Sequence, residues 1–102
     1  MKELFTIGEM AELFQINIRT LRYYDDIGLL CPETVNPETG YRYYSTKQFE
    51  RLNTIKYLRT LNMPLEKMKQ FFQNRDARVM EQILEDQLLA TRDQLAQLQN
   101  ME

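Results

Sequence analysis

The chain has 102 residues, 43 % apolar and 27 % charged, with a formal net charge of −2, and this length allows one domain with a small core, or one domain with an extension. No apolar run is long enough to cross a membrane, and the N-terminus lacks the basic and apolar regions of a signal peptide, so we expect a cytoplasmic protein with no membrane partner. With one cysteine and no histidine, the chain cannot form an internal disulfide and lacks the ligands of a zinc site, so we expect no metal and no cofactor.

The first expected elements are two short amphipathic helices. Thr6 and Glu9 form the capping pattern T-x-x-E in front of an apolar stripe, which predicts a helix over Ile7–Phe14. Asn17 is a good N-cap for a second helix that ends near Asp26. Two helices joined by about three residues are typical of a helix-turn-helix, whose second helix enters the major groove of DNA.

The second helix has two distinct faces. Arg19, Arg22 and Tyr23 share one face, and Leu21 lies on the other. Two neighbouring tyrosines on a helix point about 100° apart, so both cannot be fully buried. We therefore assign Tyr24 to the core and Tyr23 to the face that meets DNA.

Catalytic patterns are missing from the sequence. Asp25 and Asp26 resemble a carboxylate pair, but adjacent helical residues do not face each other, and we expect them to bond to nearby backbone or to orient an arginine. We interpret Cys31 as a partly buried small residue rather than a redox centre. No nucleophile with a base, metal set or glycine-rich phosphate loop is present, so the chain is not expected to be an enzyme.

A hairpin is expected after the second helix. Glu33–Val35 and Tyr41–Tyr44 are short extended segments, and a turn over Asn36–Gly40 would join them into two strands. A lone hairpin is barely stable, so it must lean on the helices. Arg42, set between tyrosines on a protruding ribbon, is well placed to contact a phosphate backbone.

Two further helices follow the hairpin. Ser45 and Gln48 form a second capping pattern, which predicts a helix over Thr46–Leu61. Pro64 is favourable in the first turn of a fourth helix, Leu65–Gln73. The winged part of the chain is therefore expected to cover residues 1–74.

The last expected element is one long helix of roughly 25 residues that ends near Asn100. It belongs to the segment 75–102, which we expect to mediate dimerisation. From the boundary at Asn74–Asp76 to Asn100 the sequence contains no proline or glycine. Its apolar spacing of four and three residues is a coiled-coil seam made of Leu84, Leu88, Thr91, Leu95 and Leu98. So small a domain cannot cover this seam, and a partner helix is therefore implied. Met80 and Ile83 lie on an adjoining face that can pack on the chain's own domain.

The charge is unevenly distributed. Residues 1–74 carry ten basic and nine acidic side chains, whereas residues 75–102 carry three and six. The segment Arg19–Lys69 holds nine basic and six acidic residues, among them the pair Lys56 and Arg59. Although the net charge opposes binding to nucleic acid, the positive charge gathers where a binding face is expected.

In this order the elements resemble the N-terminal half of the MerR family of bacterial transcription regulators. The stretches that carry the resemblance are TIGEMAELFQINIRTLRYYDDIGLL, NPETGYRYYS and IKYLRTLNMPLEKMK. They match the family's IGE-type first helix, its L-R-Y-Y-D/E recognition helix, its G-L-L/F-x-P exit, its R-x-Y wing and its helix-start proline. The chain is most similar to the multidrug-responsive, BmrR-like branch.

The resemblance implies a mainly α fold, which is a winged helix-turn-helix with a small β-hairpin wing and a long C-terminal coiled-coil helix. It implies a homodimer, joined by an antiparallel coiled coil, that binds a pseudo-palindromic promoter operator and distorts the spacer so that RNA polymerase can use it. The expected DNA-binding residues are Asn17, Arg19, Arg22, Tyr23, Tyr41, Arg42, Lys56 and Arg59.

Two alternatives stay open. The family usually appends a C-terminal domain that senses an effector, so this chain is either a fragment or a minimal regulator, and any effector ligand is expected to bind a domain absent from it. No cysteine lies near the end of the long helix, so metal sensing there is not expected.

The second alternative concerns the function. Instead of a DNA-binding regulator, the chain could be an interaction module whose last helix pairs with a different protein and which does not bind DNA.

Overall fold

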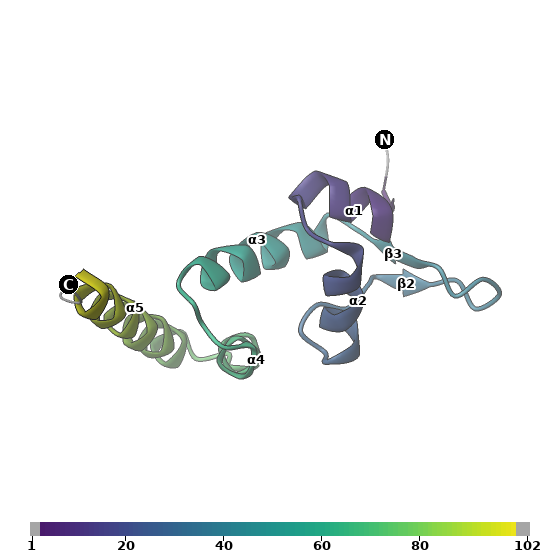
Figure 1. Ribbon diagram of the computed structural model, residues 1–102. Helices are drawn as coiled ribbons and strands as arrows, with labels where there is room; N and C mark the ends of the chain where they lie inside the picture. The colour runs from purple at the N-terminus through teal and green to yellow at the C-terminus, as the bar shows by residue number, and fades with distance from the viewer. Residues whose placement is uncertain (1–2, 100–102) are drawn as a thin grey trace. The chain divides into compact units, whose positions relative to one another are not determined.

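The computed structural model describes residues 3–99, which form five helices and a small sheet (Figure 1). In chain order the elements are β1 (Phe5–Thr6), α1 (Ile7–Phe14), α2 (Ile18–Asp26), β2 (Thr34–Val35), β3 (Arg42–Tyr44), α3 (Lys47–Thr60), α4 (Leu65–Gln73) and α5 (Ala77–Gln99). The chain divides into two compact units, Met1–Ile55 and Lys56–Glu102. No helix in the described part is long and apolar enough to cross a membrane.

Side-chain caps set the ends of α1 and α2. The Thr6 hydroxyl accepts a hydrogen bond from the Glu9 amide at 3.1 Å, and the Glu9 carboxylate accepts one from the Thr6 amide at 3.0 Å. Gln15, at a φ of 53°, ends α1 in the left-handed conformation. The Asn17 side chain then accepts from the Arg19 amide at 2.8 Å and starts α2. Both helices begin and end at the predicted residues.

The sheet has three strands rather than the predicted two. Its order is β1-β3-β2, because Phe5 and Thr6 pair with Tyr44 and Tyr43 along the edge of β3 opposite to β2. The predicted hairpin of β2 and β3 is confirmed. The additional strand β1 was not predicted, because a strand of two residues has no periodicity of its own, and these two residues also carry the start signal of α1. The predicted strand at Tyr41 starts one residue later, at Arg42.

Asparagine and glycine shape the turn between β2 and β3, which projects from the first unit (Figure 1). The Asn36 side chain accepts hydrogen bonds from the amides of Glu38 and Thr39, at 2.9 and 3.4 Å. Gly40 has a φ of +75°, a conformation that other residues adopt only with strain. Its amide donates to the Asn36 carbonyl at 2.7 Å and closes the predicted turn.

The core of the first unit lies where α1, α2, β3 and the first part of α3 supply apolar side chains. Eight of its residues are at most 2 % exposed: Met10, Leu21, Tyr24, Leu29, Leu30, Tyr44, Leu52 and Ile55. The rings of Phe5 and Phe14 pack on Phe49 with centroids 5.1 and 5.2 Å away. The assignment of Tyr24 to the core is confirmed.

α3 is one residue shorter at each end than predicted, although its start signal is confirmed. The Gln48 side chain accepts from the Ser45 amide at 2.7 Å, and the Ser45 hydroxyl accepts from the Lys47 amide at 3.2 Å. Glu33, just before β2, accepts a hydrogen bond from the Gln48 side chain at 3.2 Å. This contact ties the wing to the beginning of α3.

The second unit buries Leu58, Met63 and Met68. Pro64 is the N-cap of α4, one position before the helical turn expected for it, because its ψ of 151° is extended although its carbonyl already accepts from the Met68 amide. α5 has 23 residues and is roughly 35 Å long. Asn100, the predicted last residue of this helix, lies outside the described residues.

Candidate nucleic-acid interface

The outer face of α2 presents the residues predicted to meet DNA. Arg19, Arg22 and Tyr23 are exposed, whereas Leu21 on the opposite face is fully buried. Asn17 is also exposed, but its side-chain oxygen is occupied by the cap on the Arg19 amide. Its amide NH₂ is therefore the group left to donate to a phosphate or a base.

Residues of α2 and of the wing meet around one concavity of the first unit. A cavity of about 250 Å³ is lined by Thr6, Ile7, Arg22, Gly40, Tyr41 and Arg42. Two guanidinium groups and a phenol supply donors of the kind that bind phosphate oxygens or the edges of bases. The first residue of α1 is part of the same lining, at the positive end of a helix. The concavity therefore suits a negatively charged backbone.

An ion pair joins the wing to α2. Arg42 Nε, on the first residue of β3, lies 2.8 Å from Asp25 Oδ2, on the last turn of α2, and the two side chains are 28 % and 22 % exposed. The hydrogen bond to Asp25 raises the pKa of the Arg42 guanidinium, a group that is already charged throughout the physiological pH range. The expectation that an aspartate here orients an arginine is confirmed.

Tyr41 stands at the exposed end of the wing turn. Its side chain is 65 % exposed, but its backbone is held: its amide donates to the Thr39 hydroxyl at 3.2 Å, and its carbonyl accepts from the Asn36 amide at 2.9 Å. A rigid turn with an exposed phenol can contact DNA at a low cost in conformational entropy.

The alternation of side chains along β3 explains why Arg42 and Tyr44 both lie near Asp25, a polar cluster that the sequence did not predict. Arg42 and Tyr44 point to the same side of the sheet. Burial, and then the nearby Asp25 carboxylate, raises the pKa of Tyr44 to about 12. Cys31 is exposed, so the prediction that it is partly buried was wrong. Some desolvation and the same carboxylate still raise the pKa of its thiol, which supports its interpretation as an unreactive residue. The period of two in RYY was the available signal, but it does not say what lies opposite.

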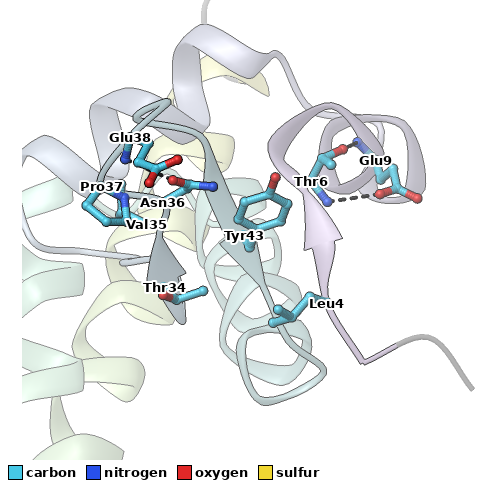
Figure 2. Close-up of a pocket in the computed structure, with 9 residues that line it drawn as sticks. All are labelled: Leu4, Thr6, Glu9, Thr34, Val35, Asn36, Pro37, Glu38 and Tyr43. Carbon is cyan, nitrogen blue, oxygen red and sulfur yellow. Dashed lines mark hydrogen bonds between the residues drawn. The ribbon is translucent and has the colours of Figure 1, made fainter.

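Tyr43 points to the other side of the sheet, into a shallow hollow (Figure 2). This hollow measures about 670 Å³ and is lined by Leu4, Thr6, Glu9, Thr34, Val35, Asn36, Pro37, Glu38 and Tyr43. Its charged side chains, Glu9 and Glu38, are both acidic, so it would repel phosphates. The two faces of the sheet therefore differ in charge, and only the face with Arg42 suits DNA.

The remaining predicted DNA contacts belong to the second unit. Lys56 and Arg59 lie three residues apart on α3, which places them on neighbouring positions of the helix surface. Lys56 is half-buried and Arg59 is exposed. Their contact with phosphates stays a prediction.

The predicted dimerisation seam lies along α5 with uneven exposure. Leu84, Leu88 and Thr91 are half-buried, while Leu95 and Leu98 are 54 % and 66 % exposed. The Thr91 hydroxyl donates to the Leu61 carbonyl of the same chain at 2.5 Å, and the Gln87 side chain donates to that carbonyl at 2.7 Å. Val79 and Leu89 are exposed apolar residues outside the predicted seam.

Among residues 3–99, no cluster of three or more metal-ligating side chains is present. The fold of the first unit, two short helices with a wing beside them, defines a winged helix-turn-helix protein. The sequence profile of the MerR HTH family of regulatory proteins matches residues 5–75. The chain belongs to this family of transcription regulators.

Curated relatives show which regulators the chain is similar to. It is 48 % identical over 63 residues to the transcriptional regulator BrlR of Pseudomonas aeruginosa, an alignment that covers 62 % of this chain and 23 % of BrlR. It is 47 % identical over 70 residues to the multidrug-efflux transporter 1 regulator of Bacillus subtilis, covering 68 % and 25 %. The aligned stretches span about a quarter of these relatives.

Solved structures agree with the fold. The EcmrR–DNA complex, determined by cryo-electron microscopy within EcmrR-RPo, has a TM-score of 0.76 at 29 % identity, covering 92 % of this chain and 34 % of that one. HiNmlR, a MerR family regulator that lacks the sensor domain and is bound to promoter DNA, has a TM-score of 0.74 at 26 % identity, covering 94 % and 79 %. The expected fold class is confirmed.

Proposed function

We propose that this chain binds a pseudo-palindromic promoter operator as a homodimer and distorts the spacer DNA between the half-sites. The observation that carries the proposal is the meeting of Arg22 from α2 with Tyr41 and Arg42 from the wing around one concavity. Its support from relatives is that two similar solved structures are complexes with DNA.

Each part of the interface has a physical role. α2 inserts into the major groove, where Arg19 and Arg22 can form paired hydrogen bonds with guanine edges. Tyr41 and Arg42 of the wing, with Lys56 and Arg59, bind backbone phosphates and fix the position of α2. Energy spent on bending and untwisting the spacer is recovered through phosphate contacts from both protomers.

The proposed partners follow from this role. The protein acts in the bacterial cytoplasm, where promoter DNA is located, and affects RNA polymerase indirectly through the shape of the promoter. No effector is assigned to residues 3–99. The exposed Leu95 and Leu98 of α5 support pairing with a second helix, and a second copy of this chain is the partner that a palindromic site requires.

The test replaces Arg22 by alanine. The DNA probe is a 30-base-pair duplex that the wild-type protein selects from a random pool, and affinity is measured by fluorescence anisotropy. Arg22→Ala should weaken binding by about 10- to 100-fold, the cost of losing a paired contact to a base. The side chain is exposed, so the circular dichroism spectrum should be unchanged.

Arg78→Ala is the matched control, because Arg78 is an exposed arginine in the first turn of α5. It removes the same charge from a residue that is not among the proposed DNA contacts and should change affinity by less than about twofold. Equal losses in the two variants, or no selection of any duplex, would refute the proposed function.

A further inference from the structure

We propose that Asp25 is a positioning residue for DNA binding: through Arg42 it holds the wing against the recognition helix, so that both meet one duplex in a fixed geometry. The inference rests on the proposed function, because it concerns how the same surface recognises DNA. It assigns a role to an acidic residue that, by charge alone, would weaken the attraction of the protein for phosphates.

The pair is built so that Arg42 can serve two partners. Asp25 accepts from Nε at 2.8 Å, and Nε is only one of the three donor nitrogens of a guanidinium. The bond fixes the plane of the group and leaves the two terminal nitrogens to donate to a phosphate. The arginine also lines the cavity that Arg22 and Tyr41 share. A fixed guanidinium loses less entropy when it binds.

Because of its position in the sheet, the ion pair between Asp25 and Arg42 can restrain the whole wing. β3 is the central strand, and Arg42 pairs directly with Val35 of β2. The residue before it, Tyr41, closes the wing turn through its carbonyl. A contact at Arg42 therefore restrains both arms of the hairpin. On the side of β3 that carries Arg42, Tyr44 is fully buried, whereas the side chains of Arg42 and Asp25 are partly exposed. The ion pair therefore lies at the outer edge of the core.

If Asp25 acts only as a negative charge, its neutralisation should strengthen DNA binding. If it positions the wing, its neutralisation should weaken binding to the selected duplex. Removing a negative charge near DNA should tighten binding to any duplex. Releasing the wing should weaken only the binding that depends on a defined geometry, which is binding to the selected duplex. Asp26 is the matched control, because it is the next acidic residue and is exposed. Its charge also acts on Arg42, but more weakly than that of Asp25, which accepts the hydrogen bond.

The experiment compares Asp25→Asn with Asp26→Asn on two probes: the 30-base-pair selected duplex and a scrambled duplex of the same composition. Asp26→Asn should tighten binding to both and change their affinity ratio by less than about twofold. Asp25→Asn should leave scrambled binding equal or tighter and weaken selected binding, so that the ratio falls by about 5- to 20-fold. Asp25→Glu, which keeps the carboxylate, should restore part of the ratio.

The salt dependence of binding supplies a readout that a loss of stability would not give. If the released Arg42 no longer contacts its phosphate, the slope of log affinity against log salt should become shallower by about one unit per protomer in Asp25→Asn. In Asp26→Asn the slope should be unchanged. Arg42→Ala should then cost less in the Asp25→Asn background than in the wild type, because the two residues act together.

Identical behaviour of Asp25→Asn and Asp26→Asn would overturn the inference while leaving DNA binding intact. A failure of the wild type to prefer the selected duplex would instead refute the proposed function. If Asp25→Asn does not fold, Arg42→Lys gives the decision, because a lysine ammonium can pair with Asp25 but cannot also present the terminal nitrogens of a guanidinium. A wild-type ratio and slope in Arg42→Lys would contradict the inference.

Discussion

Tyr44 combines a favourable ring position with an uncompensated hydroxyl. Its side chain is fully buried, and its hydroxyl has no hydrogen-bond partner within the described structure. A buried polar atom without a partner costs about 1–3 kcal/mol of stability. The residue stabilises the fold through its ring, which fills the core behind β3, and the hydroxyl opposes that gain.

Alkaline unfolding should report on this hydroxyl. Burial raises the pKa of Tyr44 to about 12, whereas an unfolded tyrosine titrates near 10. Between these values the unfolded chain has lost the proton and the folded chain keeps it, so the free energy of unfolding falls as pH rises. The loss should be about 1 kcal/mol from pH 10 to 11, measured by urea unfolding. Tyr44→Phe should remove that part of the slope.

Tyr57→Phe is the control for this measurement, because Tyr57 is 52 % exposed. Its stability should follow the wild-type curve across the alkaline range. A Tyr44→Phe curve that keeps the wild-type slope would mean that other groups account for the alkaline loss. At neutral pH, Tyr44→Phe should be as stable as the wild type or more so.

Two parts of the α5 surface differ in their contacts. Gln87 and Thr91 donate to the carbonyl of Leu61, which lies in the turn between α3 and α4, so this part of the helix is fixed to its own chain. Further along, Leu95 and Leu98 are mostly exposed. Exposed leucines at coiled-coil spacing indicate where a second helix would pack.

Charged substitutions at the exposed end should separate the protomers without unfolding them. The double variant Leu95→Lys with Leu98→Lys should sediment as a monomer at concentrations where the wild type is a dimer, because two charges per chain would be buried at the interface. The helical content should stay the same, since both side chains are mostly exposed within the chain.

Gln94→Lys with Gln97→Lys adds the same charge at two exposed neighbouring positions and should leave the dimer intact. If the leucine variant stays dimeric, the interface lies elsewhere. If the wild type is itself a monomer, α5 is free to pair with a different protein, which is the alternative function class.

For the whole molecule, the net charge of −2 understates the attraction to DNA. The acidic excess lies in residues 75–102, while the proposed contacts are Arg19, Arg22, Arg42, Lys56 and Arg59. Charges further from a phosphate than a Debye length, about 8 Å at physiological salt, contribute little. Local charge is therefore expected to decide binding.

The salt dependence of wild-type binding tests this expectation. If each protomer placed all five basic residues on phosphates, a dimer would neutralise about ten, and log affinity would fall against log salt with a slope of about −9. Contacts made to bases instead would reduce this value, so we expect a slope between about −5 and −9. A titration of the selected duplex from 50 to 300 mM salt measures it, and a slope near zero would contradict a phosphate-based interface.

Several features of the fold were predictable because they depend on local sequence. Capping side chains act within three residues, so Thr6 and Asn17 gave the starts of α1 and α2 correctly. The helical period separated Tyr24, which is buried, from Tyr23, which is exposed. The family motif depends on the same short stretches, and the profile match over residues 5–75 confirms it.

The sequence alone thus determined the family, the helices and the outward face of α2, because helix signals and motifs act between near neighbours. Only the tertiary structure decided that Phe5–Thr6 adds a third strand, that Asp25 accepts from Arg42, and that Thr91 donates to Leu61. Asp25 and Arg42 are 17 residues apart in the sequence, and Leu61 and Thr91 are 30 residues apart. Such contacts follow from how elements pack, and no periodicity within one segment encodes them.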